Sequence, residues 1–97
     1  MKPNNIAAGT VGAISELAVS MDLMKRGFEV YRALSPCSRC DLMAVKNGIY
    51  FEMEVRTGAY LVNGKPWCSL KNFRAKYLAI HILGDGKTYY KPDLDTD

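Results

Sequence analysis

The sequence of 97 residues contains few cysteines, a single histidine and no long hydrophobic run. No stretch approaches the roughly 18 uninterrupted apolar residues of a membrane-spanning helix, so we expect no membrane as a partner. The first residues do not lead into a signal-peptide core, and an odd number of cysteines does not suit a disulfide framework. We therefore expect a soluble, cytoplasmic protein in which residues 1–97 form one domain, with its core at about 9–92.

Charge of either sign is only weakly in excess. Lys and Arg total 13, Asp and Glu total 10, and the net charge is +3. Three of the acids lie in the C-terminal tail 93–97, so residues 1–92 carry 13 basic and 7 acidic side chains, a net charge of +6. A basic body suits a polyanionic partner, although an ordinary solvated surface accounts for the same excess.

The cysteines leave two alternatives open. Cys37 and Cys40 have the C-x-x-C spacing of half a zinc site, and Cys68 and His81 are the other candidate ligands. These two residues are isolated and lack paired spacing, so free thiols are the competing interpretation.

Residues 9–26 have the periodicity of a helix, with apolar side chains recurring at steps of three and four. Thr10 is a suitable N-cap, and Gly27 is a natural stop. The pattern predicts that the helix buries the stripe formed by Val11, Ile14, Leu17, Ala18, Met21 and Met24.

Short extended segments follow the helix. The sequence predicts strands over 28–34, 41–45 and 49–57, and two hairpins that pair 60–62 with 66–70 and 76–83 with 88–91. Asn47 and Gly48 favour a type I′ turn between the second and third strands, because both residues tolerate positive φ. The expected fold class is α+β, with an N-terminal helix packed on a mixed, mainly antiparallel central sheet.

The third predicted strand carries charged residues on one face. Glu52, Glu54 and Arg56 alternate with apolar residues, and the hairpin through Asn47 brings Asp41 alongside Glu54. Two carboxylates beside a cation form an oxygen-ligand site for Mg²⁺, whereas a solvated strand face is the simpler alternative. Glu16, at the edge of the helical stripe, is either a third carboxylate of this site or a solvated side chain.

Six short segments carry a resemblance to a known family: residues 12–18 (GAISELA), 27–30 (GFEV), 40–45 (CDLMAV), 51–58 (FEMEVRTG), 76–80 (KYLAI) and 88–92 (TYYKP). They resemble the restriction-endonuclease-like nucleases of the PD-(D/E)XK superfamily. They are most similar to its small members, such as Holliday junction resolvase-like and homing-endonuclease-like proteins. The resemblance covers about residues 9–92, and only the order and spacing of its short motifs make it specific.

The resemblance implies a site at named positions. Glu16 matches the helix glutamate that assists metal binding, and Asp41 and Glu54 match the metal-ligating pair, with the backbone carbonyl of Val55 as a further ligand. Arg56 stands where the family has a lysine. A guanidinium can hold a phosphate oxygen and stabilise negative charge, but it cannot act as a base.

The implied activity is hydrolysis of DNA phosphodiester bonds with Mg²⁺ or Mn²⁺, including those of branched or structured DNA. A homodimer is expected because cutting two strands usually requires two copies of the site. Because Arg56 replaces the lysine, the alternative is a catalytically silent nucleic-acid-binding or assembly module with the same fold. The side chains expected to contact the nucleic-acid backbone are Lys46, Lys65, Lys71, Arg74 and Lys76.

Overall fold

The structure is a computed structural model, and it describes residues 5–94, so most of the acidic tail predicted at 93–97 lies outside the described residues. One helix and seven strands form its elements. They are α1 (Ala8–Lys25), β1 (Glu29–Arg32), β2 (Leu42–Lys46), β3 (Ile49–Thr57), β4 (Ala59–Tyr60), β5 (Pro66–Trp67), β6 (Tyr77–His81) and β7 (Thr88–Lys91).

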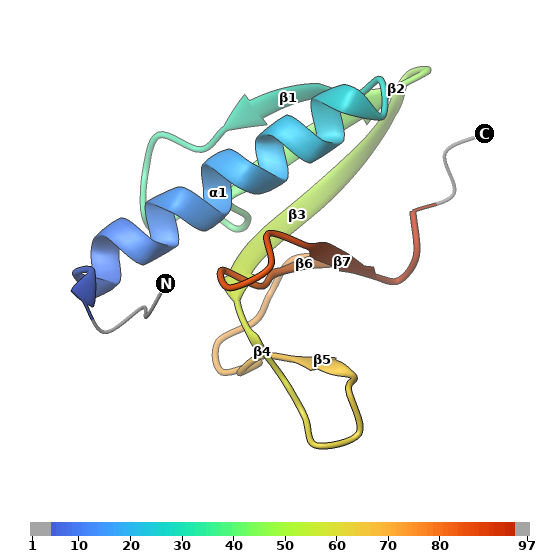
Figure 1. The fold of residues 1–97 in the computed structure, drawn as a ribbon. Coiled ribbons are helices and arrows are strands. Elements are labelled where there is room, and N and C mark those ends of the chain that lie inside the picture. Colours follow the sequence, from blue (N-terminus) through green and yellow to red (C-terminus); the bar gives the residue numbers. More distant parts are fainter. Residues whose placement is uncertain (1–4, 95–97) are drawn as a thin grey trace.

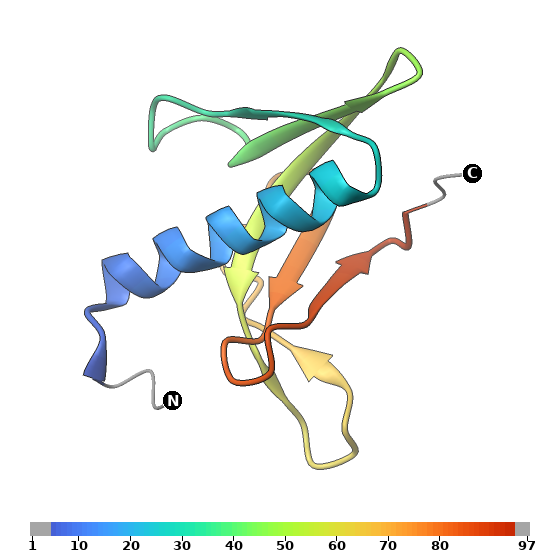
Figure 2. The ribbon, with the colours of Figure 1, turned by 45° about the horizontal axis from the view of Figure 1, so that its top comes forward.

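Five strands form a mixed sheet in the order β1-β2-β3-β6-β7, and α1 lies across one of its faces (Figures 1 and 2). β3 and β6 are parallel, and the other three neighbouring pairs are antiparallel. β4 and β5 form a separate two-stranded hairpin beyond the end of β3. This arrangement confirms the predicted fold class, a helix packed on a mixed, mainly antiparallel sheet.

The helix was predicted at the right place, but its N-cap was wrong. α1 begins at Ala8, two residues before Thr10, and its N-cap is Ala7, which makes no side-chain capping hydrogen bond. The predicted stop is confirmed, since Gly27 adopts φ 92° immediately after the last turn. A side chain is rarely tolerated at such a φ, which is why a glycine ends the helix here.

The buried face of α1 also differs from the predicted stripe. Ser15, Val19 and Leu23 are the buried residues, whereas Leu17 and Met21 are more than half exposed. The helix carries apolar residues on most of its sides, so periodicity alone does not select one face. The contact with the sheet selects it, because Val19 and Leu23 share a core cluster with Met53 of β3.

Strand positions agree better with the sequence pattern. β3 spans the predicted residues 49–57, and the Asn47-Gly48 turn has the expected positive φ values of 53° and 76°. β1 is shorter than predicted, ending at Arg32 rather than Leu34, and Leu34 is fully exposed. β2 begins at Leu42, so Asp41 lies immediately before the strand.

A second, smaller apolar cluster lies on the sheet face opposite α1. Leu78 and Ile80 of β6 point to this face, because the neighbouring Ala79 belongs to the cluster under the helix. Cys68 and Ile82 complete the second cluster, and Phe73 packs against it. The segment from β5 to β6 therefore covers this face, which is the face that carries the charged residues of β3.

Among residues 5–94, no helix has the length and hydropathy needed to cross a membrane.

Candidate active site

Asp41 and Glu54 lie next to each other at one end of the β2–β3 pair. Leu42 pairs with Met53 in the antiparallel register, so the next position along places Asp41 opposite Glu54. The backbone N–H of Asp41 donates to the carbonyl of Met53 at 3.0 Å, and Asp41 Oδ2 accepts a 2.8 Å bond from the N–H of Val55. These bonds fix the Asp41 carboxylate against the strand that carries Glu54, as the sequence predicted.

Arg56 forms a multidentate contact with Glu54. Its Nε donates to Glu54 Oε2 at 3.0 Å, and its Nη2 makes a second, closer contact with the same oxygen. The side chains are only 21% and 15% exposed, so this ion pair is screened less by water than a surface pair would be. Arg56 therefore neutralises the carboxylate that the sequence predicted as a metal ligand.

Backbone carbonyls of the β5–β6 segment also accept hydrogen bonds from the Arg56 guanidinium. Nη1 donates to the carbonyl of Ser69 at 2.8 Å, and Nη2 donates to that of Lys71 at 2.9 Å. The backbone N–H of Arg74 also approaches Glu54 Oε1 at 3.4 Å. The Glu54–Arg56 pair thus connects β3 to this segment, and sequence reasoning missed these partners because backbone acceptors leave no residue-type signal.

Basic side chains surround Asp41 and Glu54. Arg39 Nε bonds Glu52 Oε1 at 2.9 Å, and this hydrogen bond, together with the charge of nearby Lys76, holds the pKa of Glu52 below its ordinary value. Glu52, which the sequence predicted either as a site carboxylate or as a solvated one, is therefore committed to an ion pair. Exposed Lys71 and Arg74 lie on the segment that contacts Glu54.

A groove of about 560 Å³ lies beside this end of the sheet. It is lined by Pro36 and Cys37 from the β1–β2 loop and by Asn72 and Arg74 from the β5–β6 segment. Arg74 Nη2 donates to the carbonyl of Ser38 at 3.1 Å and so joins the two loops. The groove is open, and a basic side chain lines it next to the carboxylate pair.

Glu16 and Lys46, which were predicted as site residues, lie away from Asp41 and Glu54. Glu16 accepts a 3.4 Å bond from Arg32 of β1, and the structure does not group it with Asp41 and Glu54. Lys46 lies at the opposite end of β2, where its Nζ donates to the carbonyl of Arg26 at 2.8 Å and sits over the Phe28 ring. This lysine caps the C-terminus of α1.

Lys65 is exposed in the loop between β4 and β5, beyond the end of β3. Five cationic side chains were predicted to contact the nucleic-acid backbone. Three of them, Lys71, Arg74 and Lys76, lie on the segment beside Asp41 and Glu54.

The zinc alternative finds no support in the described part of the chain. Within residues 5–94, no group of three or more His, Cys, Asp or Glu side chains is placed to hold a metal ion. Cys68 belongs to the cluster opposite α1, whereas His81 alternates with Ile80 and faces the other side of the sheet. His81 instead bonds the hydroxyl of Thr88 through Nδ1 at 3.0 Å, and Cys37 is exposed.

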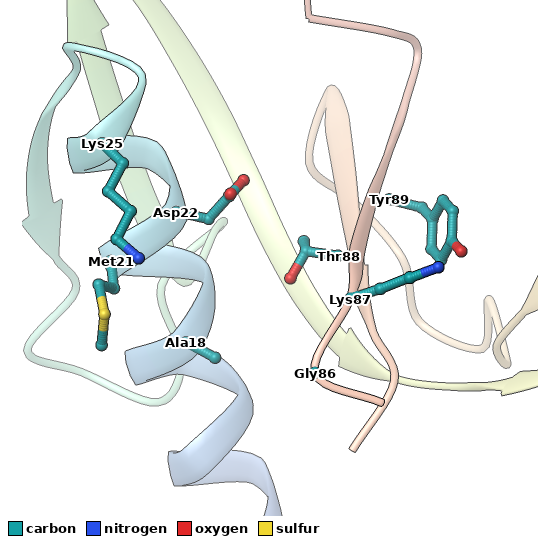
Figure 3. Close-up of a pocket in the computed structure, with 8 residues that line it drawn as sticks. All are labelled: Ala18, Met21, Asp22, Lys25, Gly86, Lys87, Thr88 and Tyr89. Carbon is teal, nitrogen blue, oxygen red and sulfur yellow. The ribbon is translucent and has the colours of Figure 1, made fainter. Parts of the chain in front are cut away.

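A second cavity, of about 400 Å³, lies between α1 and the β6–β7 turn (Figure 3). Asp22 is its one carboxylate, and it already accepts a 2.6 Å bond from the Tyr90 hydroxyl and pairs with Arg26. Figure 3 shows Lys87 pointing away from the helix. Among the described residues that line this cavity, Asp22 is already bonded and no second carboxylate is present, so they offer no pair of carboxylates.

No protein-family profile matches the chain. No curated protein matches it either. Among solved structures, it is similar to a bacterial homing endonuclease, I-Ssp6803I, with a TM-score of 0.72 and 16% sequence identity. The match covers 87% of this chain and 64% of that chain, so the present sequence spans less than two thirds of the longer protein. The two proteins share a fold.

Proposed function

We propose that this protein is a metal-dependent DNA endonuclease of the PD-(D/E)XK type, with its site at Asp41, Glu54 and Arg56. The register that places Asp41 opposite Glu54 is the observation that carries the proposal. The fold shared with a protein described as a homing endonuclease supports it, as do the cations on the segment beside the pair.

The donor set suits Mg²⁺ or Mn²⁺. Mg²⁺ is commonly held by one or two carboxylates, while water and substrate phosphate complete its coordination, so two carboxylates suffice. When bound, the ion would supply a Lewis acid that neutralises charge at the scissile phosphate. Asp41 is already oriented by the Val55 N–H, whereas Glu54 must loosen its contact with Arg56 to become a ligand.

Arg56 has a separate role in this proposal. A phosphate oxygen that enters the site can replace Glu54 as the acceptor for the guanidinium, because phosphate and carboxylate fit the same planar fork. The carbonyls of Ser69 and Lys71 keep the guanidinium in position during that exchange. Arg56 then stabilises negative charge on the phosphate, and it takes no proton.

The test is cleavage of branched, duplex and single-stranded DNA of matched sequence, with Mg²⁺ or Mn²⁺ and with EDTA. We expect metal-dependent cleavage that Asp41→Asn and Glu54→Gln each reduce by at least about 100-fold, since a lost ligand removes several kcal/mol of charge stabilisation. Glu29→Gln is the matched control, because Glu29 is an exposed acid on β1. Cleavage that persists at the control rate in both site variants would contradict the assignment.

The same assay tests two finer features. Preference for branched DNA is measured as the ratio of cleavage rates on a four-way junction and on the matched duplex. A homodimer is proposed because two copies are needed to cut both strands, and light scattering of the protein with junction DNA measures its mass.

A catalytically silent DNA-binding module is the second candidate, and the Glu54–Arg56 pair favours it. In that pair, the proposed metal ligand Glu54 and the proposed phosphate-binding group of Arg56 are bonded to each other. In this case the wild type binds DNA in a salt-dependent manner without metal-dependent cleavage, and Arg56→Lys gains cleavage. Cleavage by the wild type that falls in Arg56→Lys would eliminate this candidate.

A further inference from the structure

The β4–β5 hairpin, residues 59–67, presents apolar side chains to solvent. Figures 1 and 2 show it extending from the end of β3 away from the five-stranded sheet. Trp67 is 53% exposed, Val62 is fully exposed, and Tyr60 and Leu61 are 40% and 46% exposed. Clustered exposed apolar groups are typical of a binding surface rather than of a free one.

The two faces of the hairpin differ in how firmly they are held. The Tyr60 hydroxyl donates to Asp85 Oδ2 at 2.5 Å and lies 2.9 Å from the Tyr89 hydroxyl, so this face rests on the β6–β7 turn. Trp67 pairs with Ala59 in the register, and alternation places both on the other face. The residue opposite Trp67 is thus no larger than a methyl group, which leaves the indole open to a planar ligand.

Gly58 fixes the hairpin to the site. A Cβ at Gly58 would lie 2.3 Å from the carbonyl oxygen of Trp67 and 2.5 Å from a methyl group of Ile80, so only glycine permits this packing. Gly58 also donates to the carbonyl of His81 at 2.9 Å. One residue, Thr57, separates it from Arg56, so the backbone at Trp67 is held close to the strand that carries the candidate active site. A binding surface whose backbone is already held in place loses less entropy on binding than a free loop does.

The charge around the hairpin favours a polyanion. Residues 55–84 contain no Asp or Glu, and Asp85, which follows them, accepts a bond from the Tyr60 hydroxyl on the face of the hairpin away from Trp67. The same residues include Arg56, Lys65, Lys71, Arg74 and Lys76. A protein partner would favour an apolar centre depleted in lysine, whereas nucleic acid combines phosphates with flat apolar bases.

We propose that the hairpin is a base-stacking platform, on which Trp67 stacks against a base that has left the helix while Lys65 contacts a neighbouring phosphate. This inference rests on the proposed function in taking DNA as the partner, and it names the substrate class. In a fully paired duplex the base faces are covered by their neighbours. The preferred DNA therefore has unstacked bases, as bulges, single strands and branch points do.

Trp67 is the one tryptophan in the sequence, so intrinsic fluorescence reports on it directly. The protein is titrated, in EDTA to prevent cleavage, with a paired duplex and with the same duplex carrying a three-nucleotide bulge. We expect the bulged DNA to quench the fluorescence and to protect the indole from acrylamide, and the paired duplex to do neither. Trp67→Ala should bind bulged DNA roughly 5- to 150-fold more weakly and paired DNA with unchanged affinity, measured by anisotropy.

Tyr50→Ala is the matched control, because Tyr50 is an exposed aromatic residue near the other end of β3, and its affinity for bulged DNA should equal that of the wild type. Trp67→Phe should retain part of the preference for the bulge, since a smaller ring still stacks. Equal quenching by both DNAs, or an unchanged affinity in Trp67→Ala, would overturn the proposal. So would DNA-free self-association that buries Trp67, since the hairpin would then be a protein interface.

The same variants separate this inference from the proposed function. Asp41→Asn should lose cleavage and keep quenching by bulged DNA. Quenching without any wild-type cleavage would refute the endonuclease and leave the platform intact. Cleavage without quenching would refute the platform and leave the endonuclease intact.

Discussion

The two faces of the central sheet are built from the same strands and have different properties. On the face under α1, Leu42, Ala44 and Met53 are completely buried and form one apolar cluster with the helix. On the opposite face, the intervening positions of β3 carry Glu52, Glu54 and Arg56. Alternation along β3 therefore places its buried apolar side chains under α1 and its charged side chains on the opposite face, beside the second apolar cluster.

The covering element explains why the second face tolerates charge. A helix offers mainly side chains to a sheet, because its backbone groups are bonded internally. The irregular β5–β6 segment instead offers free carbonyls, and Arg56 uses those of Ser69 and Lys71. Polar groups on this face therefore find partners without a helix above them, as buried polar groups require.

The largest expected effect comes from a pair of methionines on opposite faces. Met53→Ala removes a completely buried side chain from the cluster under α1 and should lower the free energy of unfolding by about 2–5 kcal/mol. Met43 lies on the adjacent strand and faces the other side, where it is half-buried, so Met43→Ala should cost less than about half as much. Urea unfolding measures both losses in the free energy of unfolding, which are comparable when the m-values are equal. Equal losses would mean that the two faces contribute alike.

A smaller effect is expected from two arginines on the charged side. Arg56→Met leaves the Glu54 carboxylate poorly exposed and without its cation, which should cost about 1–3 kcal/mol of unfolding free energy. Arg39→Met breaks the Glu52 pair, in which the arginine is 59% exposed, and should cost clearly less than Arg56→Met because water screens the pair. Adding Glu54→Gln to Arg56→Met should recover part of the loss in the same urea assay. No recovery would show that Arg56 stabilises through its carbonyl contacts alone.

The smallest expected effect is the response of the helix-side face to pH. Burial lowers the pKa of His81, so the folded protein favours the neutral ring more strongly than the unfolded chain does. The contribution of His81 to the free energy of unfolding is fully present above the ordinary histidine pKa of about 6.5. It is lost as the pH falls toward the lower pKa that His81 has in the folded protein. Between pH 8 and pH 5, the melting temperature should fall less steeply for His81→Asn than for the wild type. Parallel curves would exclude His81 as the cause.

Several elements were predictable because their signals are local. The nine-residue β3 and its type I′ turn follow from alternation and from two residues that tolerate positive φ. The placement of Asp41 opposite Glu54 follows from the same turn, because a two-residue loop fixes the register of the pair. Two of the three residues of the candidate site, Asp41 and Glu54, are thus brought together by one hairpin.

Other elements were wrong or missed because a distant segment decides them. Ser15 is not part of the predicted apolar stripe, yet it is buried and bonded to the Thr57 hydroxyl of β3. Trp67 has a size that suits a core position, and it is exposed because Ala59 pairs with it and the hairpin stands away from the sheet. Lys46 resembles a DNA-binding cation until its contact with the helix terminus is seen.

The sequence alone determined the α+β class, the helix and the strand that carries Glu54 and Arg56, since each depends on the periodicity of neighbouring residues. Tertiary structure decided which face of α1 is buried, that Glu16 pairs with Arg32, and that Arg56 is held between Glu54 and two backbone carbonyls. The physical reason is that burial and charge pairing depend on what lies opposite a side chain, and here the opposing groups come from segments far away in the sequence.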